Sequence, residues 1–596
     1  MTFNRNNLGQ AVSPYLQQHK DNPIHWQEWS KEVLEHAKKN NKIIFVSVGY
    51  TTCHWCHVMA NEAFSSQEVA DFLNEHFISI KVDKEQRPDI DNYMMSFIQE
   101  TEGHGGWPLN IFLTADLKPF LAVTYLPLET RHGLSGFLHL LEHLKENYDH
   151  HKGEIKNYLP SIPPPEPCPE EGIIKVIKNS FIDHGFTLGP QFSPHNTLLF
   201  LLSYYEKNKD KEIKEIIEKI LEVIATRGLQ DHLQGGFYRY CVDSSWSIPH
   251  FEKMLYDQAM LLWVYSIAYK VLRKAEYKII VEKIVRCLED TFADSLYYTA
   301  HDADTDHQEG ETYLWSKEEL EEDLTLAEYQ QFRELYHLEN NAEGKIHLIK
   351  KENSFLPQIE QKLLQIRKQR KQPFTDKKCI TSWNALVGVG LINAYRSLND
   401  ELLKAKAIIL FKNILATQYR QGVLHHSSYK GELQDGEFLE DYAALLLFAT
   451  YIYEETREYK EMIKTLSHQV ERFRDQQWIE SHNTDFIKIQ ASTFDHPTPS
   501  STSLAEMAKL RASIILGEEY PQAEYREPLQ HDFFNLMVFV KNGNWHLIHA
   551  PHKIEWKHLP ANCIQVFDQK IQDCHQQKCQ EFKDVSELLA TVRKKE

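Results

Sequence analysis

The sequence predicts a multidomain protein in which an α/β domain at the N-terminus is followed by an all-α domain built as a double-ring helical barrel. Three observations predict this fold class. Strand and helix patterns alternate before residue 160, helical patterns dominate after residue 172, and a stretch with six prolines lies between them. A chain of 596 residues is also too long for one hydrophobic core, so two or more domains are expected.

The first 159 residues are predicted to form the α/β domain. The run Lys42-Ile-Ile-Phe-Val-Ser-Val48 is almost uninterrupted in its apolar character, as in a strand buried on both faces. Further strands are expected at 77–83, 109–114 and 121–125, and helices at about 56–74 and 135–148. This order suits a mixed sheet flanked by helices. The prolines at 160–172 forbid regular ladders and favour an extended linker.

Residues 173–520 are predicted to form the barrel, and residues 521–596 a C-terminal extension. Three helices are apolar nearly all round and should be buried on every side, namely 255–272, 385–395 and 442–453. Three others are amphipathic and should face water on one side, namely 213–226, 401–419 and 459–475. This alternation fits inner and outer helices. One exception is 296–315, where aromatic pairs flank a polar stretch and predict an inserted β-hairpin.

The segment Cys53-His54-Trp55-Cys56 follows the first strand and enters a helix. The first sulfur would lie near the unpaired N–H groups of the helix start, which favour the thiolate and lower its pKa, and a protonated His54 would add to this effect. We therefore predict that Cys53 attacks a substrate disulfide and that Cys56 resolves the mixed disulfide. Pro108 begins the third strand, so a cis Trp107–Pro108 bond is expected. In thioredoxin-like folds such a proline packs against the cysteine pair.

Other interpretations of the pair stay open. Cys53-X-X-Cys56-His57 matches the attachment pattern of c-type haem, although no export signal precedes it. Zinc would need a second pair such as Cys574 and Cys579, whose spacing is poor for a metal site. The pair could also be two buried thiols without chemistry. The strand-to-helix context favours the redox interpretation.

Several polar residues are candidates for a site in the barrel. Those at the beginnings of the apolar helices are His250, Glu252, Asp257, Trp383, Asn384, Glu440 and Asp441. A glycine-containing loop adds Asp231, His232, Tyr238 and Arg239, and the predicted hairpin adds His301, Asp302 and Asp304. If the inner helices share one direction, these side chains converge on one mouth of the barrel. Such a mouth would be a ligand-binding site.

Carboxylates, imidazoles and aromatic rings around one mouth are what sugar chemistry uses. Trp246 and Trp383 could stack on a sugar ring. Simpler roles are open for several candidates. Asp257 and Asp441 could cap helices or favour the positive helix end, Asn384 could bond to neighbouring loops, and His250 could be a satisfied interior histidine.

Composition narrows the partners and the compartment. The net charge is −19 and no basic run offsets it, so nucleic acid is not expected as a partner. The N-terminus has no apolar signal region and no window reaches about 18 apolar residues, so we expect a cytoplasmic protein without a membrane span. Nine cysteines, mostly single in apolar contexts, fit a reducing compartment. We expect no cofactor and no metal.

The chain resembles the family of spermatogenesis-associated protein 20 and its bacterial relatives. The resemblance rests on the motifs at 22–26, 53–59, 82–91, 103–108, 235–240, 249–258, 381–384 and 439–442. It implies a thioredoxin-like domain joined to an (α/α)6 barrel that is similar to six-hairpin glycosidases and to N-acylglucosamine 2-epimerase. The partners implied are a protein disulfide client or thiol reductant, and a sugar-like small molecule.

The chain departs from the family in two places. Residues 495–503 lack the Asn of a Ser-Gly-Asn stretch in relatives, and the chain beyond about 520 looks abridged. The tail with Cys574 and Cys579 instead resembles a cysteine-containing tail in relatives, which implies a structural disulfide or a relay to Cys53. Three functions remain: a thiol–disulfide protein whose barrel binds a ligand or client, a carbohydrate-active enzyme with a structural or regulatory redox domain, and a binding protein without activity.

Overall fold

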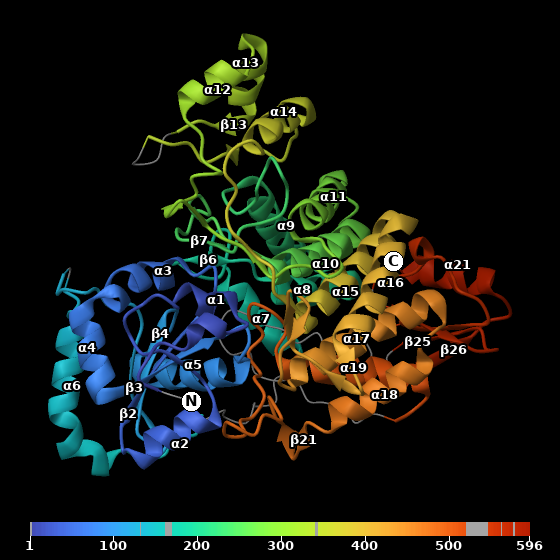
Figure 1. The fold of residues 1–596 in the computed structure, drawn as a ribbon. Helices are drawn as coiled ribbons and strands as arrows, with labels where there is room; N and C mark the ends of the chain where they lie inside the picture. Colours follow the sequence, from blue (N-terminus) through green and yellow to red (C-terminus); the bar gives the residue numbers. More distant parts are fainter. Residues whose placement is uncertain are drawn as a thin grey trace.

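The computed structural model describes residues 3–131, 133–160, 170–339, 344–519, 546–561, 563–575 and 578–595. It confirms the predicted fold class: a thioredoxin-like α/β domain is followed by an all-α barrel of inner and outer helices. In Figure 1 the α/β domain lies on one side of the barrel and a small C-terminal sheet lies on the other. Residues 161–169, which make up most of the predicted linker at 160–172, lie outside the described residues.

The N-terminal domain is built on a five-stranded sheet with the order β1-β3-β2-β4-β5. Its strands are β1 (Gln27–Glu28), β2 (Ile43–Gly49), β3 (Phe77–Asp83), β4 (Leu109–Leu113) and β5 (Pro119–Val123). The first three are parallel, and β4 and β5 are antiparallel to their neighbours. Every residue of β2, β3 and β4 is buried, which explains their nearly continuous apolar pattern. The last strand begins at Pro119, two residues before the predicted start.

Helices cover both faces of this sheet. On one face α2 (Lys31–Lys39) and α5 (Pro88–Glu102) pack against the apolar side chains of β2, β3 and β4. The other face is covered by α1 (Pro14–Gln18), α3 (His54–Asn61), α4 (Gln67–His76) and α6 (Phe137–His151). The result is the three-layer arrangement expected for a mixed sheet flanked by helices.

The single helix predicted at 56–74 is wrong. The chain forms α3, a 3₁₀ turn at Ala63–Ser65, and α4. Glu62 leaves the helical region with φ −95° and ψ −94°, and Ser66 then starts α4 because its hydroxyl accepts the N–H of Val69. The N-cap serine was the signal for this break.

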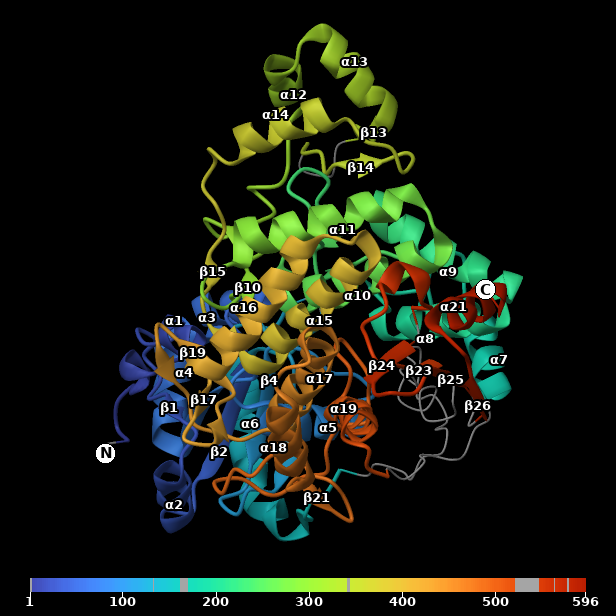
Figure 2. The ribbon, with the colours of Figure 1, turned by 90° about the vertical axis from the view of Figure 1, so that its right-hand side faces the viewer.

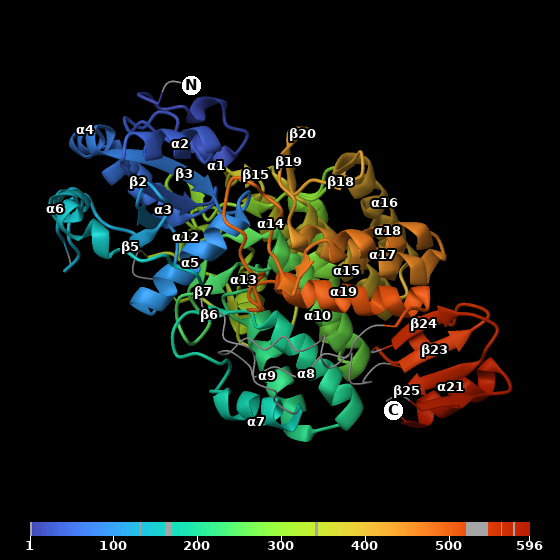
Figure 3. The same cartoon turned by 90° about the horizontal axis from the view of Figure 1, so that it is seen from below.

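The inner layer of the barrel is formed in the described residues by α8 (His195–Asn208), α10 (Leu255–Leu272), α15 (Thr381–Leu398), α17 (Leu439–Thr456) and α19 (Ser501–Leu516). They are neighbours in this order. The amphipathic helices α7 (Glu170–Ser180), α9 (Lys211–Thr226), α11 (Ala275–Cys287), α16 (Glu401–Thr417) and α18 (Lys460–Glu471) lie outside them. The predicted bounds of the helix at 255–272 match α10, and α15 and α17 extend three to four residues beyond the predicted ends on each side. Figure 3 shows both layers from below.

The inner helices α10, α15 and α17 run in one direction, with their N-terminal ends towards the α/β domain. At their C-terminal ends, Lys270 donates to the carbonyl of Pro560 at 3.1 Å and the guanidinium of Arg396 lies 3.6 Å from the ring centre of Trp556. Glu454 accepts the backbone N–H of Gln565 at 3.0 Å there. The barrel therefore presents its helix N-termini to the redox motif and its C-termini to the C-terminal sheet.

The predicted hairpin at 296–315 is wrong in extent. Only β11 (Asp304–Thr305) and β12 (Gln308–Glu309) pair as a hairpin. The earlier β10 (Ala300–His301) pairs instead with β9 (Lys253–Met254) and β15 (Thr375–Asp376), because it bridges two loops at the barrel mouth. A lobe of α12 (Lys317–Asp323), α13 (Leu326–Leu335) and α14 (Pro357–Arg367) follows and projects from the barrel in Figure 2.

Short strands connect the barrel helices. These are β6 (Gln191–Phe192), β7 (Tyr240–Cys241), β8 (Pro249–His250), β13 (Tyr336–His337), β14 (Ile349–Lys350), β16 (Cys379–Ile380), β17 (Tyr419–Arg420), β18 (Val423–Leu424), β19 (Ser427–Tyr429), β20 (Glu432–Leu433), β21 (Arg474–Asp475) and β22 (Gln477–Trp478). Their loops form the mouth. None of the described helices combines the length and apolar character that a bilayer crossing requires.

The C-terminal part adds a four-stranded sheet with the order β24-β23-β25-β26 and a final helix, α21 (Val585–Lys595). Its strands are β23 (His546–Ala550), β24 (Cys563–Phe567), β25 (Gln572–His575) and β26 (Lys578–Glu581). Cys574 and Cys579 form a disulfide across β25 and β26. This sheet lies on the side of the barrel opposite to the redox motif, so Cys574 and Cys579 neither share a zinc site with Cys53 nor relay electrons directly to it within one chain (Figure 1).

Candidate active site at the domain interface

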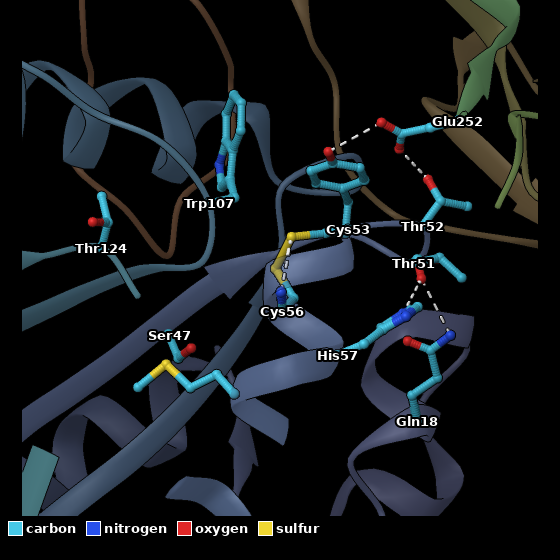
Figure 4. Close-up of a disulfide and its surroundings, with 12 residues drawn as sticks. Gln18, Ser47, Thr51, Thr52, Cys53, Cys56, His57, Trp107, Thr124 and Glu252 are labelled. Atoms are coloured by element: carbon cyan, nitrogen blue, oxygen red, sulfur yellow. Dashed lines mark hydrogen bonds between the residues drawn. A yellow bond between two sulfur atoms is a disulfide. The ribbon is translucent and has the colours of Figure 1, made fainter. Parts of the chain in front are cut away.

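The cysteine pair lies where β2 passes into α3. Cys53 is the N-cap residue of α3, and its sulfur accepts the backbone N–H of Cys56 at 3.2 Å. Cys53 and Cys56 form a disulfide, which Figure 4 shows with its surroundings. The sulfur of Cys53 thus occupies the anion-favouring end of a helix, as the sequence predicted.

The Trp107–Pro108 peptide bond is cis, as predicted. The side chain of Trp107 packs against the apolar cluster that contains both cysteines. Its indole N–H donates to Asp91 at 2.8 Å, and the ammonium of Lys84 lies 3.9 Å from the ring centre. Both partners of Trp107 come from the motif at 82–91, which follows β3.

The disulfide is buried among apolar side chains of its own domain, and the residues beside it contact the barrel. Cys53 is 3% exposed and Cys56 is 1% exposed. Glu252, which is fully buried on the loop before α10, accepts hydrogen bonds from the hydroxyl of Thr52 and, at 3.4 Å, from the hydroxyl of Tyr50 (Figure 4). Arg239 donates to Tyr50 and, at 3.2 Å, to Glu252. The residues just before Cys53 are therefore fastened to the barrel mouth.

A second set of contacts reaches the residues after Cys53. The Nδ1 atom of His54 lies 3.1 Å from both carboxylate oxygens of Asp304 on β11. The Nδ1 atom of His57 lies 3.9 Å from Asp304, and its Nε2 atom lies 2.7 Å from the carbonyl oxygen of Thr51. Asp302, beside Asp304, is 4% exposed. Four polar side chains from two domains thus gather around the start of α3.

The charges in this cluster depend on each other. The hydrogen bond to Asp304 raises the pKa of His54 above its usual value. Burial opposes a charge on His57, but Asp304 and Asp302 outweigh it and raise the pKa of His57 too. Burial raises the pKa of Asp302 to about 7. Burial also disfavours charge on Asp304, yet the two histidines hold the pKa of Asp304 below its ordinary range. Positive charge on His54 and His57 near the helix start would favour a Cys53 thiolate.

The motif at 82–91 forms much of the remaining interface. Asp83 and Glu85 make ion pairs with the fully buried Lys378 at 2.6 Å and 2.8 Å, and Asp376 lies 3.4 Å from the same ammonium. Burial raises the pKa of Glu85, although Lys378 opposes the shift. One ammonium is shared by three buried carboxylates, two from the α/β domain and one from the barrel, so Lys378 holds the two domains together.

His426, on the loop before β19, joins the same interface. Its Nδ1 atom lies 2.7 Å from Asp441 in the first turn of α17, and its Nε2 atom lies 2.8 Å from the carbonyl oxygen of Glu85. Burial disfavours its charge, yet attraction to Asp441 outweighs burial and raises the pKa of His426 to about 9. Burial, followed by the charge of Asp441, raises the pKa of Glu440.

Several polar atoms at the mouth have no hydrogen-bond partner among the described residues although they are buried. They are the hydroxyl of Tyr256, Oδ2 of Asp257, both ring nitrogens of His195, Nε of Arg239 and Nδ1 of His250. Asp257 and His195 do form an ion pair at 3.3 Å. Buried polar atoms are normally paired, so this group suits a polar ligand or ordered water.

The predicted site residues divide into those that meet at the interface and those with structural roles. The mouth brings together His250, Glu252, Arg239, Asp302, Asp304 and Asp257 near the redox motif. Asp257 and Asp441 lie in the first turns of α10 and α17, where a carboxylate favours the positive helix end, and neither is the N-cap residue of its own helix. Asp441 also accepts the backbone N–H of Ser382 in the first turn of α15 at 2.9 Å. His250 stacks on Tyr240, and its ring nitrogens lie 3.8 Å from Glu252 and 3.7 Å from Glu309.

Other candidates are held by the barrel itself. Asp231 is neutralised by Lys253 at 2.7 Å and by both arms of Arg367. His232, Tyr238 and Trp246 are buried, so Trp246 offers no face to a sugar. Asn384 accepts the N–H of Tyr297 and donates to its carbonyl, which is the simple loop-fastening role. His301 lies 2.7 Å from the hydroxyl of Thr375, and Trp383 packs edge-on against Tyr256.

Several residues of this interface were not predicted as site residues from the sequence, namely Tyr50, Thr52, His57, Glu85, Lys378 and His426. The available signal was the dense charge of the motif at 82–91, which directly follows a fully buried strand. Charged side chains in such a place need partners from another part of the chain.

Comparison with known proteins finds a family model for the N-terminal domain and relatives over most of the chain. Residues 5–162 match the family described as a protein of unknown function, DUF255 (Thioredox_DsbH). The chain is 32% identical over 610 residues to an uncharacterized protein of Caenorhabditis elegans, which covers 89% of this chain and 82% of that protein. It is 31% identical over 531 residues to spermatogenesis-associated protein 20 of Mus musculus, covering 76% of this chain and 67% of the relative. Among solved structures, a sugar epimerase from a ruminal bacterium is 14% identical, with a TM-score of 0.31, and covers 58% of this chain and 97% of that chain.

Proposed function

The chain belongs to the family of spermatogenesis-associated protein 20, and we propose that it is a thiol–disulfide redox protein whose barrel binds a ligand or client at the mouth beside Cys53. The observation that carries the proposal is the position of the Cys53 sulfur. It lies at the start of α3 and receives the N–H of Cys56, and its neighbours Thr52 and His54 bond to side chains of the barrel.

The proposed reaction begins with the reduced pair. The Cys53 thiolate attacks one sulfur of a substrate disulfide, which forms a mixed disulfide and releases the first substrate thiol. The Cys56 thiolate then attacks Cys53, which closes the Cys53–Cys56 disulfide and releases the second thiol. Two electrons pass from the cysteine pair to the substrate, and a thiol reductant returns the pair to the dithiol. The helix start favours the attacking thiolate.

The low exposure of Cys53 limits the size of the substrates that can reach its sulfur. Because only 3% of Cys53 is exposed, a small disulfide suits this arrangement better than a folded protein client. The unpartnered polar atoms of Tyr256, Asp257 and Arg239 support a small polar ligand, of which a sugar-like polyhydroxy molecule is one class.

Disulfide exchange by the full chain tests the proposal. The reduced protein is mixed with a small aromatic disulfide and, separately, with a disulfide-bonded protein, and thiol release is followed by absorbance. We expect exchange with the small disulfide that Cys53→Ser abolishes. Equal rates for the wild-type chain and Cys53→Ser would remove the proposal.

A second candidate is carbohydrate chemistry at the same mouth. The convergence of unpartnered polar atoms at the inner helix starts favours it. A screen of reducing sugars and glycosides separates the two candidates. Sugar turnover that survives Cys53→Ser and fails in His250→Ala would support the carbohydrate function, whereas redox exchange that fails in Cys53→Ser supports the first.

A further inference from the structure

The imidazole of His57 is held with one nitrogen occupied and the other directed at two carboxylates. The Nε2 atom donates to the carbonyl oxygen of Thr51 at 2.7 Å, since a carbonyl can only accept. The Nδ1 atom lies 3.9 Å from Asp304, which is too long for a hydrogen bond. An imidazole whose other N–H is fixed by a backbone carbonyl is how proteins orient histidine towards a metal ion.

The carboxylates of Asp302 and Asp304 complete this arrangement. One ligand atom from each, together with one from His57, lies within 4.8 Å of the others. The only hydrogen bond recorded for the Asp302 carboxylate is one at 3.1 Å from the backbone N–H of Asp304, although this carboxylate is buried. Two carboxylates and one neutral imidazole carry a charge of −2, which a divalent cation balances.

We propose that His57, Asp302 and Asp304 bind one divalent transition-metal ion of the Zn²⁺ class. Imidazole ligands favour such ions over Mg²⁺ and Ca²⁺, which prefer oxygen alone. From the sequence we expected no metal. The ion joins the start of α3 to the β11–β12 hairpin and so ties the redox helix to the barrel. No cysteine is a ligand, so the inference does not rest on the proposed redox function.

In the other cluster of this kind in the described residues, the imidazole has no free ring nitrogen. His426 lies near Glu440 and Asp441, but its Nδ1 bonds to Asp441 at 2.7 Å and its Nε2 bonds to the carbonyl of Glu85 at 2.8 Å. With both ring nitrogens engaged, His426 serves as an ion-pair partner. His57, by contrast, has a ring nitrogen without a hydrogen bond, and we therefore place the metal ion at His57 and not at His426.

Calorimetric titration of the oxidised full chain with Zn²⁺, after dialysis against a chelator, tests the site. We expect one tight ion per chain and no comparable binding of Mg²⁺. Affinity should fall about tenfold or more in His57→Ala and in Asp304→Asn, since even outer-shell changes act on this scale. The exposed His143→Ala and the double variant Cys53→Ser/Cys56→Ser should bind like the wild-type chain.

X-ray absorption of the Zn²⁺-loaded wild-type chain keeps the test decisive if a variant fails to fold. We expect a first shell of nitrogen and oxygen with imidazole scattering and no sulfur. Sulfur in that shell, absence of a tight site in the wild-type chain, or unchanged affinity in a folded His57→Ala would each overturn the inference. Loss of disulfide exchange in Cys53→Ser would leave it untouched.

Discussion

At the scale of single residues, the sulfur of Cys53 differs from the other thiols of the described chain in its surroundings. Cys241, Cys287, Cys379 and Cys563 are buried without a disulfide partner. Burial raises the pKa of each of these thiols, to about 12 for Cys379 and Cys563. Cys53 instead caps a helix beside two histidines. Reactivity should therefore concentrate at one position.

Alkylation of the reduced chain at mildly acidic pH should label Cys53 before any other cysteine. The reason is that the thiolate is the nucleophile, and among the cysteines of the described residues Cys53 is the one that caps a helix start. Peptide mapping by mass spectrometry after brief treatment with a small alkylating agent measures this order. Slow and equal labelling of all cysteines would be evidence against an activated Cys53.

The buried His426 predicts how stability depends on pH. Its pKa is about 9 in the folded chain against 6.5 when unperturbed, so its protonated form stabilises the fold fully below pH 6.5. This stabilisation, on the order of 3 kcal/mol, is lost as the pH rises through about 9. Melting temperatures of the wild-type chain should fall over this window. His426→Gln should show a shallower decline, while His143→Gln, on an exposed site, should keep the wild-type slope; equal slopes in all three would contradict the assignment.

At the scale of helices and strands, the predicted bounds match the structure where contacts close in the sequence determine the element, and they fail where distant contacts do. The strand at 77–83 and the helix at 255–272 have the predicted bounds because nearly every residue in each is buried, which gives a continuous pattern. The predicted helix at 56–74 failed at Glu62, where one residue leaves the helical region inside a favourable pattern. The hairpin at 296–315 failed because β10 pairs with two strands far along the chain.

The candidate site divides in the same way. Cys53, Cys56 and Pro108 could be predicted because a short motif carries them. The bond between Thr52 and Glu252 joins residues 200 positions apart, and no periodicity encodes such a pairing. The ion pair of Lys378 with Asp83 spans 295 positions. Sequence patterns predicted which residues are chemically unusual, and the interface decides which of them meet.

The close packing of inner helices predicts a sensitive glycine. A methyl group added to Gly388 in α15 would lie 2.1 Å from the ring of Phe448 in α17. Gly388→Ala should therefore lower the free energy of unfolding by about 1–3 kcal/mol through overpacking. Denaturant unfolding measures the change. Gly153→Ala, where no atom lies within 4 Å of the added carbon, is the matched control and should be nearly neutral; similar effects in both variants would contradict the packing argument.

At the scale of the whole molecule, the two domains form one unit through a buried charged interface. Lys378 is the only cation recorded in ion pairs with Asp83, Glu85 and Asp376 among the described residues. Removing one partner of a buried charge cluster leaves uncompensated charges in a poorly hydrated site. The interface should therefore depend on Lys378 more than on any surface ion pair.

Lys378→Met should cost about 3–5 kcal/mol of stability and should loosen the α/β domain from the barrel. Thermal unfolding measures the first effect, and limited proteolysis between the domains measures the second. Lys38→Met removes an exposed pair with Asp116 and should cost no more than about 1 kcal/mol. If Lys378→Met matched that control, the interface would not be held by this cluster.

We have proposed that Cys53 and Cys56 form an exchangeable redox pair at the barrel mouth. Equilibration of the full chain in glutathione buffers of graded potential, with thiol trapping and mass spectrometry of the peptide that contains both cysteines, tests it most directly. We predict one two-electron transition between dithiol and disulfide, at a reduction potential within the range of known redox proteins. In Cys56→Ser we expect a mixed disulfide with glutathione on Cys53. If the pair stayed oxidised or stayed reduced at every buffer potential, with no glutathione adduct on Cys53, the proposed redox role would be contradicted.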